Sequence, residues 1–213
     1  DAEEIGIFDA AARRYYNFSI AHTDVGGLAA KFVGCTTAPS GVVVFAPHNA
    51  DAVGVFTIGT SWGASGATFL PEQSTFDLIS ISPSLLSAPA KFWGATTTYF
   101  PQPAVVFAPY DSPGVGFVTG TTLNTGLDTD MAFSLIDIEG PGLVTGGAKY
   151  RGAVEVQGSG ILLVPYNATD LALFSVVSST ITLMRRFDLT NAIAPHAKFS
   201  GVTMSPLGDL ILV

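Results

Sequence analysis

Apolar residues in this chain occur in short runs that are bounded by Gly, Pro, Asn or Asp. The runs are rich in Val, Ile, Phe and Thr, which pack well on a pleated sheet and are typical of β-strands. No helical period extends over the length of a normal helix, and residues 9–16 form the one weak helical candidate. The pattern therefore predicts an all-β protein.

A lysine-containing pentapeptide sets the frame for these runs. AKFVG, AKFWG, AKYRG and AKFSG begin at Ala30, Ala90, Ala148 and Ala197, and the chain has no lysine outside them. The spacings between successive lysines are 60, 58 and 49 residues. Repeats of about 40–60 residues with strand-like content are typical of propeller blades, which have four strands each.

Each repeat has room for four strands, named a to d in chain order. Strand a is the stretch that begins with the lysine. Strand b is the apolar run before a proline, predicted at 42–45, 104–107, 161–164 and 210–213. Strand c is predicted at 53–56, 115–117, 171–174 and 5–8, and strand d at 15–21, 75–81, 131–138 and 186–190. A glycine recurs three residues after each lysine, which indicates a close approach between blades or a β-bulge.

The fourth repeat stops after strand b, and its missing half matches the other end of the chain. DAEEIGIF at 1–8 aligns with NADAVGVF at 49–56. We therefore predict a single β-propeller domain over 1–213, with repeats at 31–90, 91–148, 149–197 and 198–213 plus 1–30. In this all-β, four-repeat propeller the N-terminal strands c and d close the last blade with the C-terminal strands a and b. The alternatives are four repeats cut from a longer propeller, or two ends that pair with another chain.

The repeat also carries a family resemblance. K-[FY]-x-G, then [AV]-P-x-[ND], then V-G-[VI]-F resembles an uncharacterised β-propeller repeat family seen in protist, algal and marine viral proteins. The pattern covers nearly the whole chain, although the third repeat has LALF at 171–174 in place of VGVF. The resemblance implies an architecture and no agreed activity.

Composition excludes two classes of partner. The net charge is −8, whereas nucleic-acid binders usually carry a basic patch. The long uncharged runs at 32–50 and 52–71 are interrupted by Pro or Gly, so they do not predict a membrane helix. Charged residues make up 12% of the chain, against roughly 25% in typical soluble domains. So little charge suggests deep burial, or a surface that neighbouring subunits cover.

The lysines allow two main interpretations besides plain surface exposure. Strand a lies innermost in a propeller, so each lysine is expected near the mouth of the central channel. The turns between strands b and c carry Asp51, Asp111 and Asp170, and a repeated Lys–Asp pair would offset the desolvation of a partly buried ammonium group. In the other interpretation the ammonium groups form a ring that binds a small anion. The candidate ligand-binding residues are the four lysines and two residues at the variable position that follows them: Lys31, Lys91, Lys149, Lys198, Trp93 and Arg151.

No catalytic or metal-binding constellation is recognisable, so neither a catalytic residue nor a cofactor is predicted. The three histidines, His22, His48 and His196, occupy different positions of the repeat and lack metal-ligand spacing. Cys35 is interpreted as a core residue, and Asp128 with Asp130 lacks the full ligand run of a calcium loop.

Two hypotheses about function follow. The favoured one is a non-catalytic structural or interaction propeller in a larger assembly such as a virion or extracellular coat, with protein partners or self-assembly through apolar insertions near 59–70, 82–89 and 119–130. The alternative is a ligand-binding or lectin-like propeller that takes a small anion or sugar at the channel mouth, and less favoured is a hydrolase. An extracellular or virion location is preferred to the cytoplasm. Asn17 and Asn167 each begin a triplet that fits the N-glycosylation pattern, and such triplets also occur by chance.

Overall fold

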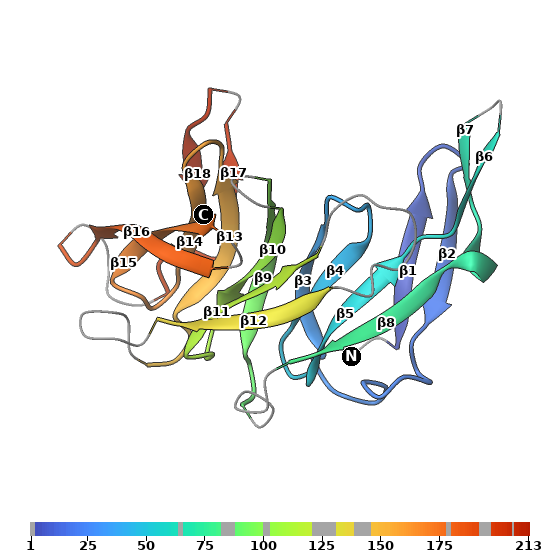
Figure 1. Cartoon of the computed structure of the whole chain (residues 1–213), viewed down its shortest axis with the longest axis horizontal. Helices are drawn as coiled ribbons and strands as arrows, with labels where there is room; N and C mark the ends of the chain where they lie inside the picture. Colours follow the sequence, from blue (N-terminus) through green and yellow to red (C-terminus); the bar gives the residue numbers. More distant parts are fainter. Residues whose placement is uncertain are drawn as a thin grey trace.

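The computed structural model describes residues 3–63, 66–81, 88–99, 103–120, 131–138, 146–177, 180–191, 197–205 and 207–213. Within this part the chain is a row of antiparallel β-sheets with one short 3₁₀ helix, η1 (Pro71–Gln73) (Figure 1). The described residues contain no helix that is long and apolar enough to cross a membrane. The predicted all-β class is confirmed.

Three four-stranded sheets form the centre of the row, and each follows one repeat of the sequence. Blade 1 consists of β3 (Phe32–Thr37), β4 (Val43–Pro47), β5 (Ala52–Thr57) and β8 (Thr75–Ser80). Blade 2 consists of β9 (Phe92–Thr98), β10 (Ala104–Pro109), β11 (Gly114–Thr119) and β12 (Ala132–Asp137). Blade 3 consists of β13 (Tyr150–Val156), β14 (Gly160–Pro165), β15 (Asp170–Val177) and β16 (Thr180–Asp188). A separate hairpin, β6 (Thr60–Gly63) with β7 (Gly66–Phe69), is inserted before the last strand of blade 1.

The first strands of the three blades lie side by side, as expected for the inner strands of a propeller. Strand β9 lies between β3 and β13, and the outer strands β8, β12 and β16 form the opposite edges of their sheets (Figure 1). Strands a, b and c were predicted within a few residues of the observed bounds. The last strand of blade 3 differs most, because β16 pairs with β15 from Asp188 back to Thr180, whereas the prediction began at 186. The weak helical candidate at 9–16 consists of the end of β1, a turn at 10–13 and the start of β2.

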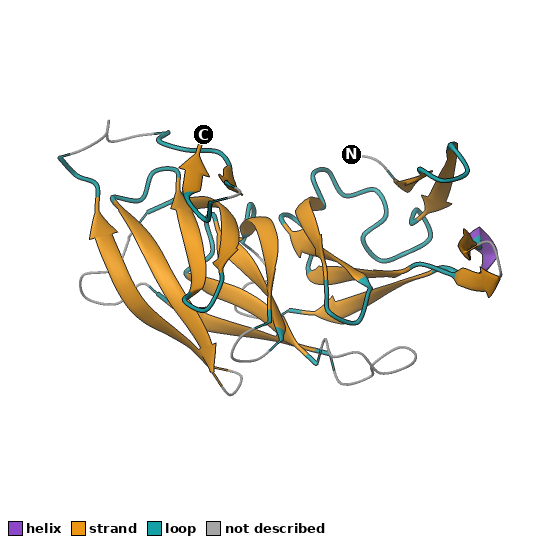
Figure 2. Ribbon diagram, turned by 90° about the horizontal axis from the view of Figure 1, so that it is seen from above, coloured by secondary structure: helices purple, strands orange, loops and turns teal. Residues whose placement is uncertain are grey.

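The fourth repeat is present as two half-blades at opposite ends of the row. The N-terminal half-blade is β1 (Glu4–Asp9) with β2 (Arg14–Ser19), and the C-terminal half-blade is β17 (Val202–Met204) with β18 (Leu210–Leu212). In the described residues each half-blade is a two-stranded sheet, and the two ends lie apart in both views (Figures 1 and 2). The expected closure of the last blade is therefore corrected. Three blades at this spacing do not turn far enough to bring the half-blades together.

The hydrophobic core lies between neighbouring blades. One cluster joins blades 1 and 2 through residues such as Val44 and Phe107, and another joins blades 2 and 3 through residues such as Phe117 and Leu163. Strands β10 and β14 are buried along their whole length, because each is paired on both edges and covered on both faces. Each fully buried Phe or Leu side chain contributes about 1.5–3 kcal/mol of transfer free energy.

A column of glycines brings the inner strands together. A Cβ atom added to Gly34 would lie 2.8 Å from the Cα atom of Gly94, and one added to Gly94 would lie 3.1 Å from the Cα atom of Gly152. All three glycines have positive φ, and a bulge interrupts each pairing of strand a with strand b. Both explanations predicted for the recurring glycine, close approach and a bulge, are confirmed.

Candidate functional site

A chain of backbone hydrogen bonds links the blades at the end where the lysines lie. The N–H of His48 donates to the carbonyl of Lys31 over 2.9 Å, and the carbonyl of His48 accepts from the N–H of Lys91 over 2.9 Å. Tyr110 joins Lys91 to Lys149 in the same way, and Tyr166 joins Lys149 to Lys198. The residue after the proline of each strand b is thereby held between two blades.

Side chains of the same turns fasten each blade to the next one. The side-chain oxygens of Asn49, Asp111 and Asn167 accept hydrogen bonds from the backbone N–H groups of Ala90, Ala148 and Ala197, over 3.0, 2.6 and 3.2 Å. These alanines precede the lysines, and all have φ between 51° and 53°, in the left-handed region that residues other than glycine rarely adopt. The strained alanines and the turns that hold them are thus a repeated structural device. The acid at Asp111, predicted to pair with a lysine, has this role.

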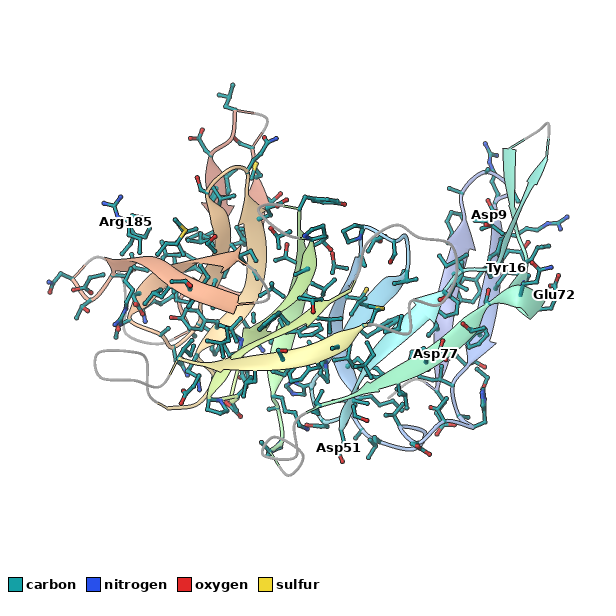
Figure 3. The ribbon with its side chains drawn as sticks, viewed as in Figure 1. Asp9, Tyr16, Asp51, Glu72, Asp77 and Arg185 are labelled. Atoms are coloured by element: carbon teal, nitrogen blue, oxygen red, sulfur yellow. The ribbon has the colours of Figure 1, made fainter. Side chains whose placement is uncertain are left out.

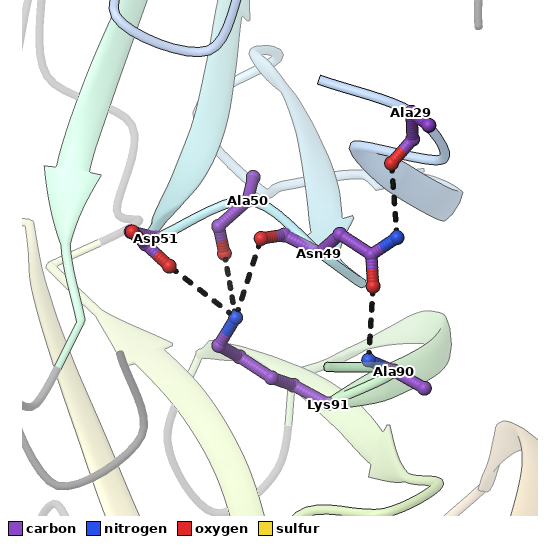
Figure 4. A network of polar contacts seen from close by, with 6 residues as sticks. All are labelled: Ala29, Asn49, Ala50, Asp51, Ala90 and Lys91. Carbon is purple, nitrogen blue, oxygen red and sulfur yellow. Dashed lines mark hydrogen bonds and ion pairs between the residues drawn. The ribbon is translucent and has the colours of Figure 1, made fainter. Parts of the chain in front are cut away.

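Lys91 shows how the buried lysines are accommodated. Its side chain is 1% exposed, and its Nζ lies 3.5 Å from Oδ1 of Asp51, 3.4 Å from the carbonyl of Asn49 and 3.3 Å from the carbonyl of Ala50 (Figure 4). Burial lowers the pKa of Lys91, and the charge of Asp51 and its hydrogen bond offset part of this effect. The predicted Lys–Asp pair is confirmed here.

Lys31 and Lys149 bind backbone oxygens. The ammonium groups of Lys31 and Lys149 are hydrogen-bonded to the carbonyls of Leu28 and Gly146, over 2.8 and 3.0 Å. Both residues are buried, whereas Lys198 in the C-terminal half-blade is half-buried. An anion-binding ring of four lysines stays a prediction. The known contacts of the three buried ammonium groups are with protein oxygens.

Trp93 and Arg151, the other two predicted ligand-binding residues, are brought together on the inner strands of blades 2 and 3. The guanidinium carbon of Arg151 lies 3.9 Å from the centre of the Trp93 ring and 4.4 Å from that of Tyr166. Trp93 packs in turn against Tyr110 at 5.1 Å and, edge to face, against His48 at 5.4 Å. We call these five residues the channel ladder: His48, Trp93, Tyr110, Arg151 and Tyr166.

The channel ladder combines stacked rings with a hydrogen-bond donor and a proton acceptor. Nδ1 of His48 lies 2.9 Å from the carbonyl oxygen of Phe92, which can only accept, so Nδ1 carries the proton and in the neutral ring Nε2 has the lone pair. Nε of Arg151 is buried and has no hydrogen-bond partner among the described residues. When a guanidinium stacks between rings, its N–H groups lie in its own plane and point past the edges of the rings. A carboxylate at that edge can accept hydrogen bonds from them.

Tyr110 and Tyr166 were not among the candidates predicted from the sequence, and His48 entered only with the other histidines, outside the six predicted ligand-binding residues. Each of the three directly follows the proline of strand b, so their equivalent positions were a usable signal. The variable position two residues after the lysine, which Trp93 and Arg151 occupy, was recognised from the sequence. The position after the proline of strand b was not recognised as part of the same site.

A second polar cluster, also unpredicted, lies in blade 3. Asp170 is buried; it accepts a hydrogen bond from the Tyr150 hydroxyl at 3.4 Å and pairs with Arg186. A hollow of about 350 Å³ opens beside them, lined also by Asp188 and Thr190. Burial, followed by the charge of Asp170, raises the pKa of Tyr150. Asp170 thus serves blade 3 itself and is not the expected counterpart of Asp51.

The remaining sequence candidates do not gather at a site. His22 is exposed, and His196, Asp128 and Asp130 lie outside the described residues. Cys35, interpreted as a core residue, is exposed on β3, which corrects that interpretation. Among the described residues no three His, Cys, Asp or Glu side chains cluster in a way that could hold a metal ion.

Comparison with known proteins shows the fold. No family model and no curated protein sequence matches the chain. It is similar to the crystal structure of selenomethionine-substituted virginiamycin B lyase from Staphylococcus aureus, with a TM-score of 0.64 and 16% identity over 99% of this chain. It covers 56% of that lyase, so it spans about half the length of its structural neighbour. A streptogramin B lyase structure is also similar, with a TM-score of 0.44 and 16% identity over 99% of this chain and 69% of that one.

The propeller class is confirmed by this likeness. The favoured hypothesis of a non-catalytic structural module is contradicted by it, because the scaffold that the chain shares is that of an enzyme, a lyase. The resemblance to the protist, algal and marine viral repeat family, the self-assembly and the virion or extracellular location stay predictions.

Proposed function

We propose that the protein binds a small organic anion that contains a ring, at the channel ladder, and acts on it in a lyase-type or hydrolase-type reaction. The observation that carries the proposal is the guanidinium of Arg151 stacked between Trp93 and Tyr166, with His48 in contact with the same tryptophan. A cationic group that could bind an anion and a nitrogen that could accept a proton thereby belong to one set of contacting side chains.

Arg151 is the group that would select an anion. Its cation–π contacts hold the guanidinium in place, so little side-chain entropy is lost when it binds a ligand. A carboxylate that accepts from Arg151 forms a charge-assisted hydrogen bond, which contributes about 1.5–3 kcal/mol. The ring of the ligand would extend the stack of Trp93, Tyr110 and Tyr166.

His48 is the group that would transfer a proton. Its hydrogen bond to Phe92 sets the tautomer in which Nε2 is free of a proton, the form that a general base requires. A lyase that works by elimination removes a proton from the carbon next to the bond that breaks; the electron pair forms a double bond, and the leaving group departs with the electrons of the broken bond. A hydrolase removes a proton from the attacking water, so either reaction could use this nitrogen. The lyase scaffold that the chain resembles supports the first of these classes.

Binding is tested with the intrinsic fluorescence of Trp93. The chain has two tryptophans, so Trp62→Phe leaves Trp93 as the only one. In this background N-acetylphenylalanine is expected to change the emission saturably, and its uncharged amide to bind roughly tenfold or more weakly, because the amide cannot form the charge-assisted bond.

Arg151→Leu provides the decisive variant, and Arg185→Leu is its matched control. Arg185 also stacks on a ring, 4.7 Å from the centre of Phe187, but lies on the outer strand of blade 3 (Figure 3). The proposal predicts that only Arg151→Leu abolishes the preference for the carboxylate, in a protein whose circular dichroism is unchanged. Equal behaviour of the two variants, or no saturable response to either compound, contradicts it.

Turnover is tested separately with two compounds. One is virginiamycin B, which appears in the name of the similar lyase, and the other is a carboxylated 4-nitrophenyl ester. Loss of either compound is followed by mass spectrometry or absorbance. His48→Gln retains an N–H donor for the Phe92 carbonyl but has no basic nitrogen. We expect it to keep N-acetylphenylalanine binding and to lose turnover. Unchanged turnover in His48→Gln would exclude His48 as the base.

A further inference from the structure

We propose that the hollow in blade 3 binds a small zwitterion of the α-amino acid type, with its carboxylate on Arg186 and its ammonium group on Asp188. The hollow has a volume of about 350 Å³, and the described residues that line it are all polar: Thr169, Asp170, Arg186, Asp188 and Thr190. Small-molecule sites have volumes of about 300–1,000 Å³. This site is separate from the channel ladder, and the proposal does not depend on the proposed function.

The hollow lies on the face of blade 3 that turns toward blade 2. Side chains of directly opposed residues in an antiparallel pair project from the same face of the sheet. Asp188 lies opposite Asp170, and Arg186 lies opposite Ala172, which packs in the core cluster between blades 2 and 3. The charged groups therefore lie on an inner face of the row, in a complete blade, and not at either end of the chain.

Blades 1 and 2 have apolar or small residues at the positions of Tyr150, Asp170 and Arg186. The equivalent residues, in the same order, are Phe32, Ala52 and Leu78 in blade 1 and Phe92, Gly114 and Leu135 in blade 2. A blade of this repeat thus folds without the polar group, and a buried ion pair gains little stability over apolar residues of similar volume. The charges in blade 3 therefore indicate a role other than folding.

Asp170 fixes the orientation of Arg186. The Asp170 side chain is buried, and both of its oxygens are occupied: Oδ1 accepts from the Tyr150 hydroxyl, and Oδ2 accepts from Nε of Arg186. The Arg186 side chain is 32% exposed, and within the described part of the chain its hydrogen bonds run only through Nε. The edge formed by its two Nη groups is thereby available to bind a carboxylate through two parallel hydrogen bonds.

Asp188 provides the opposite charge on the same face. Arg186 and Asp188 are two residues apart in β16, which places them about 6.4–6.8 Å apart along the strand. Oδ1 of Asp188 accepts hydrogen bonds from the hydroxyl and, over 2.8 Å, from the N–H of Thr190. The hydrogen bond to Asp170 raises the pKa of Arg186, and the hydrogen bonds from Thr190 lower the pKa of Asp188, so both groups are charged at neutral pH.

Two fixed, opposite charges at this spacing favour a ligand that carries both charges on a short frame. In an α-amino acid the ammonium group and the carboxylate are attached to the same carbon, so one can reach Asp188 while the other reaches Arg186. A simple anion at this place would be repelled by Asp188, and a simple cation would be repelled by Arg186. The hollow therefore fits a zwitterion better than either ion alone.

The first experiment is a titration of the ¹⁵N-labelled protein with L-alanine, followed by ¹H–¹⁵N NMR. The proposal predicts saturable shifts of the backbone amide signals of Thr169, Asp188 and Thr190. L-Lactate has a hydroxyl group in place of the ammonium group, and ethylamine lacks the carboxylate. Each is expected to bind roughly tenfold or more weakly, because one charge-assisted hydrogen bond is lost. Equal binding of the three compounds, or shifts confined to the channel ladder, would overturn the proposal.

Asp188→Asn removes the charge that would hold the ammonium group, and Asp137→Asn is its matched control. Asp137 has the position of Asp188 in blade 2, with Leu135 in place of Arg186. Both aspartates are exposed, so neither change is expected to disturb the fold. Only Asp188→Asn should weaken L-alanine binding, by roughly tenfold or more. The same affinity in both variants would refute the assignment of Asp188.

A triple variant tests the rest of the cluster without leaving a buried charge unpaired. Tyr150→Phe, Asp170→Ala and Arg186→Leu together give blade 3 the residues that blade 1 has at these positions. Because both members of the ion pair are removed, the free energy of unfolding is expected to stay the same or to rise. L-Alanine should no longer shift the signals of Thr169 and Thr190. Retained L-alanine binding in this variant would contradict the proposal.

Discussion

Strands β4 and β18 occupy the same place in the repeat but have opposite environments. In β4 the apolar side chains of Val44 and Ala46 are completely buried between complete blades, whereas Ile211 and Val213 at the matching positions are largely exposed. The two strands follow the same sequence pattern. The difference shows that an apolar pattern predicts a strand and its pairing type, while burial depends on whether a neighbouring sheet is present.

The largest difference is expected between Phe56→Ala and Phe8→Ala. Phe56 is buried in blade 1 and contacts Phe18 at 5.0 Å, so its loss should lower the free energy of unfolding by about 3–5 kcal/mol. Phe8→Ala removes an exposed ring, and we expect a change within about 0.5 kcal/mol in the single chain. Urea unfolding at a concentration where the chain is monomeric measures both. Similar losses in the two variants would show that β1 is as well packed as β5.

The glycine column provides a second pair of variants. Gly94 has a φ of 89°, and a Cβ atom there would lie 3.1 Å from the Cα atom of Gly152, so Gly94→Ala should cost roughly 1–3 kcal/mol. A Cβ atom added to Gly201, at the same position of the C-terminal half-blade, would have no neighbouring atom within 4 Å. Gly201→Ala is therefore expected to be neutral or to stabilise by about 0.4–1 kcal/mol. Thermal unfolding of both variants decides the matter, and an equal loss would mean that the half-blade is as tightly packed as blade 2.

Lys91→Met tests the ion pair between blades 1 and 2. It leaves the carbonyls of Asn49 and Ala50 without this donor and should cost about 1–3 kcal/mol. The pKa of Lys91 is lowered in the folded state, so between that value and the unfolded value near 10.4 the unfolded chain binds more protons. Stability from this group therefore rises with pH in that window. The free energy of unfolding, measured with urea at several pH values in that window, should rise with pH in the unsubstituted protein and rise less in Lys91→Met. An identical pH profile in the variant would contradict a lowered pKa for Lys91.

Tyr150→Phe is the smallest of these changes, because Phe32 and Phe92 already occupy the equivalent positions. Loss of the bond to Asp170 should cost about 0.5–1.5 kcal/mol. Above about pH 10 an unfolded tyrosine ionises, whereas the raised pKa keeps Tyr150 protonated in the folded state, so stability falls as the pH rises. The fall should be shallower in Tyr150→Phe, as measured by urea unfolding between pH 9 and 11. A fall that is equal or steeper in Tyr150→Phe would show that another group causes it.

Much of the fold could be predicted because the lysine repeat supplies a frame for every strand. The run predicted at 104–107 lies within β10, which ends at Pro109, where a proline without an N–H can still belong to a strand. Closure of the ring could not be predicted, because the match between the chain ends shows which strands are compatible but not how far three blades turn.

The candidate site was only partly predictable for a related reason. Trp93 and Arg151 stood out as variations at one repeat position. Tyr166, which contacts Arg151, lies in the turn after β14, and the sequence pattern assigned that turn only a structural role. Tyr150, Asp170 and Arg186 come from three different strands of blade 3. No short motif joins them, so only the folded sheet reveals the cluster.

Hydrogen exchange of the dilute, monomeric chain, read by mass spectrometry, tests most directly that complete blades lie in the middle of the row and open half-blades at its ends. We expect slow exchange in β10 and β14, whose backbone groups are paired on both edges and covered on both faces, and fast exchange in β18, which has one partner strand. Equal protection of β14 and β18 in the monomer would show that a single chain closes its own ring and would contradict this account.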